Sequence, residues 1–384
     1  MNPSNHSVGG SVGRRTFVKA AAIVPFAALS GTAANSAVSI GLVGAGTRGP
    51  NVCRLLVQNT PGRITALCDL YDEKIERAKK TIGIENPAVY NDYEKLLASD
   101  VDAVMISTPA FLHAEHFEKA IQAGKHIYIE KPASPDVAGC KRIMMAADSA
   151  DRKLNITFGF QRRYGQLYQK AKALLDSGAI GTVRMAIIQF LKSQGTREFP
   201  GAVDAPTKMD DKIAQWYSWR HLSGDLIVEN NIHLIDVMNW FIGEHPTRAL
   251  GTGGQTVPRL GDVRDHGTVT FDYSNNVQGT LIGTTLGPPT YRVVNERFFG
   301  DKGGIETASE YWKHFRAIDD VMTEDAPRSE TIDAVDAFVK RVAEGRPENT
   351  GVRGAESTLT AILGRMAMDH KREVTWDEMW NSEG

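Results

Sequence analysis

Three ionisable side chains are spaced so that they could handle protons at one site. Glu229, His233 and Asp236 stand four and three residues apart in a segment whose apolar residues also recur at helical intervals. Residues at these intervals share one face of an α-helix. The pattern predicts a carboxylate, an imidazole and a second carboxylate within mutual reach, which suits general acid–base catalysis. The alternative is the solvated face of an ordinary amphipathic helix.

A lysine earlier in the chain is the second catalytic candidate. Lys131 stands between Glu130 and Pro132, directly after a β-rich run. Proline disfavours the helical conformation in the residue before it, so we expect a stiff turn to aim the ammonium group. Such a lysine can donate to, or accept from, a substrate hydroxyl. Taken alone, a solvated lysine after an edge strand would explain it equally.

A glycine-rich segment carries the nucleotide-binding signal. It reads Gly44-Ala45-Gly46-Thr47-Arg48-Gly49 and joins a first β-rich run to a helix, so backbone amides at the helix N-terminus would face a pyrophosphate. Asp69 closes the second β-rich run, where a carboxylate binds the adenosine ribose hydroxyls and repels a 2′-phosphate. The combination predicts NAD, and NADP less readily. In the alternative, the glycines only form a turn and Asp69 caps a helix.

Further site residues follow from the ends of predicted strands and from the segments between the two halves of the chain. Strand ends are where an open parallel sheet binds ligands. Aromatic rings and arginines there can stack on, and hydrogen-bond to, a sugar. We expect cofactor contacts from Thr108, Pro109, His113, Glu130 and Lys131, and substrate contacts from Gln161, Arg163, Tyr164, Trp219, Arg220 and Asp236. The aromatic residues could instead belong to the core.

The elements that must position these residues fall into two halves. Short β-rich runs alternate with amphipathic helical stretches over 35–158, which predicts an α/β fold with a doubly wound parallel sheet of the Rossmann type. From 159 to 384 the pattern changes to an α+β domain with a mostly antiparallel open sheet. Runs at 268–273 and 278–284, joined by Ser274-Asn275-Asn276, predict a hairpin. We expect this sheet to cover a substrate and also a second subunit in a homo-oligomer.

The first 34 residues have the character of a targeting signal. Arg14-Arg15 precede Phe17, Lys19, a short apolar run and small residues ending at Ala34, which resembles a twin-arginine signal peptide. We therefore expect export to the periplasm or an equivalent compartment, although a disordered basic tail would share the composition. The apolar run is too short for a stable membrane anchor.

The overall composition argues against a polyanionic partner. Lys and Arg number 44 against 46 for Asp and Glu, which gives a formal net charge of -2. This balance gives no reason to expect nucleic acid binding. The three cysteines have no metal-ligand spacing, so we predict no metal site.

Together, these motifs resemble the glucose-fructose oxidoreductase, inositol dehydrogenase and rhizopine-catabolism family, written Gfo/Idh/MocA. The matching motifs are the glycine loop with Asp69, Thr108-Pro109 with His113, Ala123-Gly124-Lys125-His126 running into Glu130-Lys131-Pro132, Gly159-Phe160-Gln161-Arg162-Arg163, and His233 with Asp236. The resemblance implies that Lys131 and His233 handle the hydroxyl proton while hydride passes to NAD. Family members commonly carry Asp and Gly where this chain has Glu229 and Asn231, so the proton relay could be aimed differently.

The resemblance leaves three functions open. The first is an exported oxidoreductase that uses tightly bound NAD(H) on a secondary hydroxyl of a sugar, glycoside or cyclitol. The second is a redox-neutral, NAD-dependent glycosidase that oxidises its substrate transiently and eliminates a substituent, although the Tyr-Pro-Thr-His-Gly setting of that branch is absent. The third is a dinucleotide-binding sensor without catalysis.

Overall fold

The computed structural model describes residues 37–193, 213–257, 260–317 and 319–382. They belong to one compact unit that begins at Ala37. The predicted signal segment, residues 1–34, lies outside the described residues.

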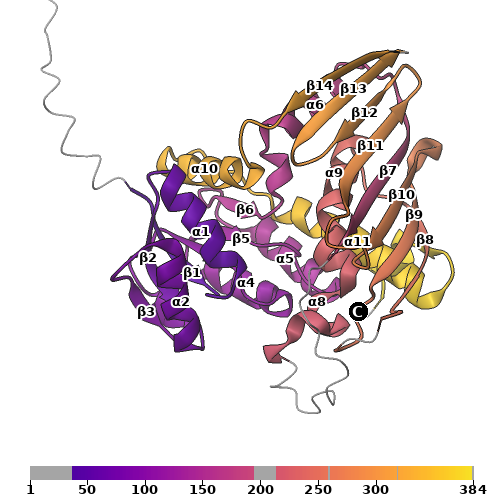
Figure 1. Cartoon of the computed structure of the whole chain (residues 1–384). Helices are drawn as coiled ribbons and strands as arrows, with labels where there is room; N and C mark the ends of the chain where they lie inside the picture. The colour runs from indigo at the N-terminus through magenta and orange to yellow at the C-terminus, as the bar shows by residue number, and fades with distance from the viewer. Residues whose placement is uncertain (1–36, 194–212, 258–259, 318, 383–384) are drawn as a thin grey trace, which may run out of the picture. The chain divides into compact units, whose positions relative to one another are not determined.

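A parallel sheet occupies the N-terminal half (Figure 1). Within the described residues it has six strands, in the order β3-β2-β1-β4-β5-β6, and they are β1 (Ser39–Val43), β2 (Arg63–Cys68), β3 (Ala88–Tyr90), β4 (Ala103–Ile106), β5 (His126–Ile129) and β6 (Ile156–Phe158). Its central strands are buried on both faces, as expected for a parallel sheet covered by helices. The strand order reverses between β1 and β4, and ligands bind at the carboxyl ends of the strands at such a point. The predicted Rossmann fold is confirmed; the short strand β3 was not predicted.

Helices connect and cover these strands. They are α1 (Arg48–Asn59), α2 (Asp72–Ile82), α3 (Tyr93–Leu97), α4 (His113–Gln122) and α5 (Val137–Ser149). Asp92 and Asp136 cap α3 and α5 through their carboxylates. A helix from the far end of the chain, α10 (Glu330–Ala343), packs against α1 and buries Val335 and Phe338 in the same core as β1. The predicted domain boundary between residues 158 and 159 assigned α10 to the second domain and did not include its packing against the Rossmann sheet.

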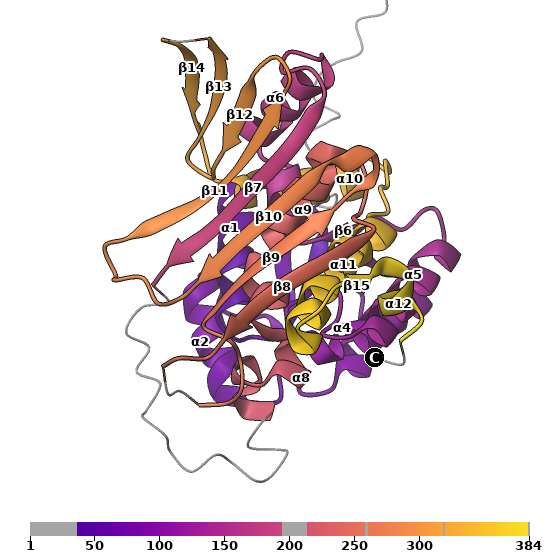
Figure 2. The ribbon, with the colours of Figure 1, turned by 90° about the vertical axis from the view of Figure 1, so that its right-hand side faces the viewer.

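A second, mixed sheet lies in the C-terminal half (Figure 2). The part of the chain that the structure describes gives it nine strands, in the order β14-β13-β12-β11-β7-β10-β9-β8-β15. They are β7 (Val183–Lys192), β8 (Arg248–Gly254), β9 (His266–Asp272), β10 (Gln278–Thr284), β11 (Arg292–Gly300), β12 (Gly304–Thr307), β13 (Tyr311–Ala317), β14 (Asp320–Asp325) and β15 (Val374–Thr375). Only β7 and β10 pair in parallel, and the predicted β9–β10 hairpin is confirmed. Strands β8 and β11 to β14 were not predicted.

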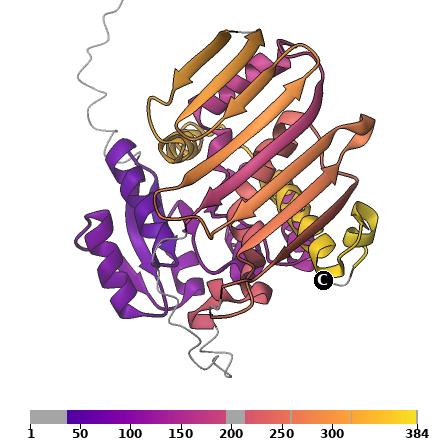
Figure 3. The ribbon, with the colours of Figure 1, turned by 45° about the vertical axis from the view of Figure 1, so that its right-hand side comes forward.

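Helices cover one face of this sheet. They are α6 (Gln166–Asp176), α9 (Ile232–Ile242) and α11 (Gly351–His370), with the shorter α8 (Arg220–Ser223) and α12 (Trp376–Trp380) nearby. Short turns complete the chain: η2 (Ala110–Leu112), η3 (Gln161–Arg163), η4 (Trp216–Ser218), η5 (Ile227–Asn231) and η6 (Ser274–Asn276). Figure 3 shows the other face of the sheet without a covering helix from the described part of the chain.

The described residues contain neither a candidate membrane-spanning helix nor a candidate metal-binding cluster. None of their helices is both long enough and apolar enough to cross a bilayer. They also hold no group of three or more His, Cys, Asp or Glu side chains arranged to bind a metal ion.

Candidate active site

The glycine loop has the shape that a dinucleotide needs. Gly44 has φ +90°, and a β-carbon there would lie 2.6 Å from the backbone oxygen of Ser107 at the end of β4. A β-carbon on Gly46 would meet no atom within 4 Å, so open space borders the loop at that point. Thr47 precedes α1 without a side-chain cap, which leaves the first backbone amides of the helix available to an anion. Asp69 Oδ2 accepts a hydrogen bond of 2.8 Å from the Ala45 amide, which fixes this carboxylate beside the loop.

Unpartnered polar atoms line the strand ends next to the loop. Arg48 begins α1, and its Nε donates to Glu130 Oε1 at 2.8 Å. The second carboxylate oxygen of Glu130 and the hydroxyl of Ser107 are buried without a hydrogen-bond partner among the described residues. Buried polar atoms are normally paired. Two buried, unpartnered polar atoms at neighbouring strand ends therefore fit a polar ligand such as the ribose and nicotinamide half of NAD.

His113 ties two strand ends together. Its Nδ1 lies 2.7 Å from the carbonyl oxygen of Pro132, and its Nε2 lies 2.9 Å from that of Thr108. The ring is buried, and burial is the largest cause that lowers the pKa of His113. The Thr108 hydroxyl lies 3.0 Å from His116 Nδ1. His113 thus links the backbone that follows β4 to the backbone that follows β5. Direct contact of His113 or Thr108 with the cofactor stays a prediction.

Lys131 reaches across to the C-terminal half of the chain. Its Nζ donates to the backbone carbonyl of Glu229 at 2.6 Å and to Oε1 of the same residue at 2.9 Å. Both side chains are about seven-eighths buried, with exposed fractions of 13% and 12%. Burial, the largest cause, raises the pKa of Glu229, while the Lys131 ammonium acts in the opposite direction. This contact places the end of β5 beside the segment that leads to His233.

Glu229 lies in a π-helical turn, η5, rather than in the regular helix that the sequence predicted. Such turns occur as single insertions in α-helices, often at functional sites, and they change which carbonyl groups remain available. The Glu229 carbonyl is one that Lys131 uses. The predicted continuous face is thereby interrupted between Glu229 and His233.

His233 lies in the first turn of the following helix, α9. Its Nδ1 is buried, and the described residues offer it no hydrogen-bond partner. Burial lowers the pKa of His233 well below its ordinary value, and the charges of Lys131, Arg162, Arg48 and Lys192 lower it further. The imidazole is therefore neutral near pH 7 and able to accept a proton.

Asp236, which the sequence predicts on the same helical face as His233, has its carboxylate paired within the protein. Both of its carboxylate oxygens accept from Arg163, with distances of 2.9 to 3.0 Å, and Ser357 donates a further bond of 2.7 Å. The carboxylate is fully buried. Asp236 and Arg163 thus form a buried ion pair that links α9 to η3, and contact of either residue with substrate stays a prediction.

Two more predicted substrate residues are also occupied by other parts of the chain. The Tyr164 hydroxyl lies 3.4 Å from Glu348, and the Arg341 guanidinium lies over its ring. Arg220 pairs with Asp369, with its Nε 3.4 Å from Asp225. Contact of Tyr164 or Arg220 with substrate therefore stays a prediction.

The remaining two predicted substrate residues differ from each other. Trp219 is 8% exposed and precedes α8, in agreement with the alternative that it is a core residue. Gln161 has a buried Oε1 without a partner in the described chain, so it remains available for a ligand.

Sequence reasoning missed several charged residues around His233. Arg162 forms a buried ion pair with Glu296 of β11. Lys192, at the end of β7, is near enough for its charge to act on His233. The sequence carried no local signal for the Arg162–Glu296 pair, because 134 residues separate its two members.

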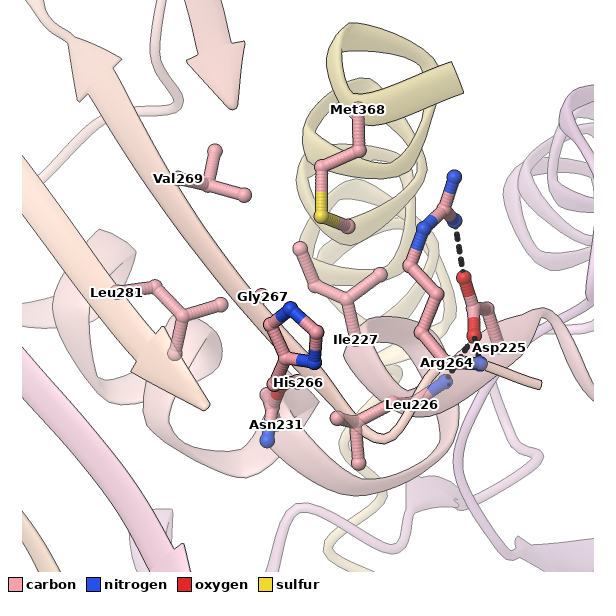
Figure 4. A pocket seen from close by; sticks show the side chains of 10 residues that line it. All are labelled: Asp225, Leu226, Ile227, Asn231, Arg264, His266, Gly267, Val269, Leu281 and Met368. Atoms are coloured by element: carbon pink, nitrogen blue, oxygen red, sulfur yellow. Dashed lines mark hydrogen bonds and ion pairs between the residues drawn. The ribbon is translucent and has the colours of Figure 1, made fainter. Parts of the chain in front are cut away.

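A small pocket lies between η5 and strand β9 and is lined in part by Ile227, Asn231 and Val269 (Figure 4). The Asp225–Arg264 ion pair and the Asn231 side chain border it, together with apolar residues such as Met368. None of the predicted catalytic or cofactor residues lines this pocket. It is separate from the candidate active site.

Comparisons with known proteins agree with the geometry. A sequence model of the Gfo/Idh/MocA oxidoreductase family with its NAD-binding Rossmann fold matches residues 38–158, and one of the family's C-terminal domain matches residues 168–306. The chain is 23% identical to the myo-inositol 2-dehydrogenase of Thermotoga maritima over 362 residues, covering 88% of this chain and 99% of that protein.

Two further relatives are informative. The inositol 2-dehydrogenase of Salmonella typhimurium is 31% identical over 206 residues, covering 53% of this chain and 54% of that protein. The solved structure of levoglucosan dehydrogenase in complex with NADH and levoglucosan has a TM-score of 0.75 at 18% identity, covering 88% of this chain and 99% of that one. The two matched family models, the Rossmann strand order and the glycine loop lead to one conclusion: this chain belongs to the Gfo/Idh/MocA family of oxidoreductases, with NAD as its cofactor.

Proposed function

We propose that this enzyme transfers hydride between NAD and a secondary hydroxyl of a sugar, glycoside or cyclitol. The observation that carries the proposal is the Lys131–Glu229 contact, which joins the strand ends of the Rossmann sheet to the turn before a neutral, unpartnered His233. Relatives named as inositol 2-dehydrogenases and levoglucosan dehydrogenase support this class of substrate.

The roles of the two residues follow from their charge states and contacts. The Lys131 ammonium donates a hydrogen bond to the substrate oxygen and stabilises negative charge as the hydroxyl loses its proton. His233 is neutral and accepts that proton. Bound NAD would supply the hydride acceptor for the carbon that carries the hydroxyl group. In the reverse direction His233 returns the proton. Glu229 holds Lys131 in place and balances its charge.

The test is turnover of a panel of pyranoses, glycosides and inositols, with NADH absorbance and product mass both measured. Lys131→Ala and His233→Ala should each lose about 10²-fold or more in rate and still bind NAD. Lys153→Ala and His370→Ala change exposed residues of the same types and serve as matched controls. Equal activity in all four variants would refute these roles.

We also propose export of the folded protein through a twin-arginine route. Arg14-Arg15, the short apolar run and the small residues before Asn35 support it. Replacing both arginines by lysine should keep the protein in the cytoplasm, measured by fractionation. An unchanged periplasmic yield would rule out this route.

Export would also constrain turnover, because an exported enzyme has no soluble NAD pool to draw on. We expect the bound cofactor to be reduced and reoxidised in the same site. Turnover without added NAD or electron acceptor tests this. An enzyme that stops after one equivalent of product, and resumes only with soluble NAD, would be an ordinary dehydrogenase.

We further propose that the uncovered face of the second sheet joins two subunits. Met185, Ile282, Phe299 and Phe315 expose 36 to 43% of their surface on that face. Exposed apolar clusters on a sheet commonly mark subunit contacts. Light scattering should give a homo-oligomer that Phe299→Glu dissociates; a monomeric wild-type protein would refute the proposal.

A further inference from the structure

Two cations lie opposite each other at the open end of the second sheet. On β7 the side chains of Ala186, Ile188 and Phe190 point to the covering helices, and strand alternation puts Lys192 on the same face. Arg292 of β11 is the direct cross-strand neighbour of Lys192. This face is the one that α9 covers, because α9 contacts both β7 and β11. Lys192 is near enough for its charge to act on His233, and Arg292 acts in turn on Lys192.

Lys192 lacks the carboxylate partner that its neighbours have. Lys131 pairs with Glu229, and Arg162 pairs with Glu296. Lys192 is partly buried and forms no ion pair within the described part of the chain; its Nζ lies 4.7 Å from the centre of the Phe190 ring. The ion pair given for Arg292 within the described residues is an exposed, distant contact of 3.9 Å with Glu310. Among these residues, the two cations therefore have less counter-charge than Lys131 and Arg162 have.

This arrangement is unfavourable without a counter-charge. Like charges directly opposite each other on neighbouring strands destabilise a sheet. Burial, and then the charges of Arg292, Lys131 and Arg162, lower the pKa of Lys192. A bound anion would relieve this repulsion. The pyrophosphate of NAD does not supply it, because the loop at Gly44–Gly49 and the N-terminus of α1 account for that group.

We propose that Lys192 and Arg292 bind a carboxylate on the substrate, so that the preferred substrates are acidic sugars such as uronic acids and their glycosides. The inference rests on the proposed dehydrogenase function and specifies its substrate. A guanidinium and an ammonium on adjacent strands can each donate a charge-assisted hydrogen bond to one carboxylate. The opposing explanation is that Lys192 only packs on Phe190 and extends its ammonium to solvent.

The experiment compares substrates that differ only in a carboxylate. Glucuronate is paired with glucose, and methyl β-glucuronoside with methyl β-glucoside, for the full-length enzyme with NAD. We expect kcat/KM to favour the acidic member by about ten- to a hundredfold, mainly through KM. Lys192→Gln and Arg292→Gln should each lower kcat/KM for the acidic member much more than for the neutral member, so that most of this preference is lost. Lys302→Gln and Arg316→Gln, at exposed positions, are matched controls.

A binding measurement separates this inference from the proposed function. With NAD present, glucuronate should raise the melting temperature of the wild type more than glucose does, and Lys192→Gln should abolish the difference. If that pattern holds but no sugar is oxidised, the dehydrogenase proposal fails and the anion site stands. If neutral sugars are oxidised as well as acidic ones, and neither variant changes the ratio or the melting shift, Lys192 only packs on Phe190 and the inference is wrong.

Discussion

Substituting three glycines by alanine should separate the structural from the ligand-binding role of the nucleotide loop. At Gly44 a β-carbon would lie 2.6 to 2.8 Å from three backbone atoms of Ser107 and Thr108, and φ is +90°. The left-handed backbone costs about 1–2 kcal/mol and the overpacking about 1–3 kcal/mol. Gly44→Ala should therefore lose about 2–5 kcal/mol of stability even without NAD.

Gly83 and Gly46 separate the backbone penalty from the effect on NAD binding. Gly83 ends α2 with φ +82° and open space around its β-carbon, so Gly83→Ala should cost only the backbone penalty of about 1–2 kcal/mol. Gly46 has a backbone conformation that other residues can adopt, and a β-carbon there would meet no atom within 4 Å. Gly46→Ala should leave the nucleotide-free protein unchanged but weaken NAD binding about tenfold or more, because its methyl group occupies space that the pyrophosphate approaches.

Thermal unfolding and NAD titration of the nucleotide-free proteins test this prediction. With about 320 described residues at roughly 2.1 cal/mol/K each, a loss of 2–5 kcal/mol lowers the melting temperature by about 3–7 °C. We expect that shift for Gly44→Ala, a smaller one for Gly83→Ala and none for Gly46→Ala. A Gly46→Ala protein that melts as early as Gly44→Ala, or binds NAD as tightly as the wild type, would refute the reasoning.

Three further outcomes follow from the site. Because the pKa of His233 is lowered, this group stays neutral to below pH 6.5, and kcat/KM for oxidation should fall only below that pH; an acid limb above pH 7 would contradict a neutral base. Asp69→Ser should shift cofactor preference toward NADP, measured as the ratio of kcat/KM values, and an unchanged ratio would remove Asp69 from ribose recognition. Asp236→Asn leaves the Arg163 guanidinium buried without a counter-charge and should cost about 3–5 kcal/mol in urea unfolding, whereas a loss under 1 kcal/mol would show that the pair is dispensable.

Local patterns predicted the first sheet and the cofactor loop well. The strands β1, β2, β4 and β5 are rich in apolar residues, and the glycines lie directly between a strand and a helix. Such features depend on neighbouring residues only, which a sequence shows. Strand β11 was missed because Asn295, Glu296 and Arg297 interrupt its apolar residues, and their burial depends on partners elsewhere.

The site was predicted in its residue types but not in its pairings. Lys131 and His233 lie in the same region, as expected. However, Glu229 pairs with a lysine 98 residues earlier, and Asp236 pairs with an arginine 73 residues earlier. The spacing of apolar residues predicts a regular helix where the structure has the π-helical turn η5. Helical periodicity cannot reveal such a turn, because tertiary contacts determine it.

The position of α10 has a consequence for how the protein is made. Phe338 packs edge-on against Tyr128 with ring centres 5.6 Å apart, and Ala334, Val335 and Val339 are buried beside β1 and α1. The nucleotide-binding sheet is therefore unfinished until residue 343 has left the ribosome, near the end of synthesis. Contacts that span most of the chain slow folding and leave apolar surface open meanwhile. A fragment ending at residue 158 would expose that surface and aggregate, and chaperones would have to shield it during translation.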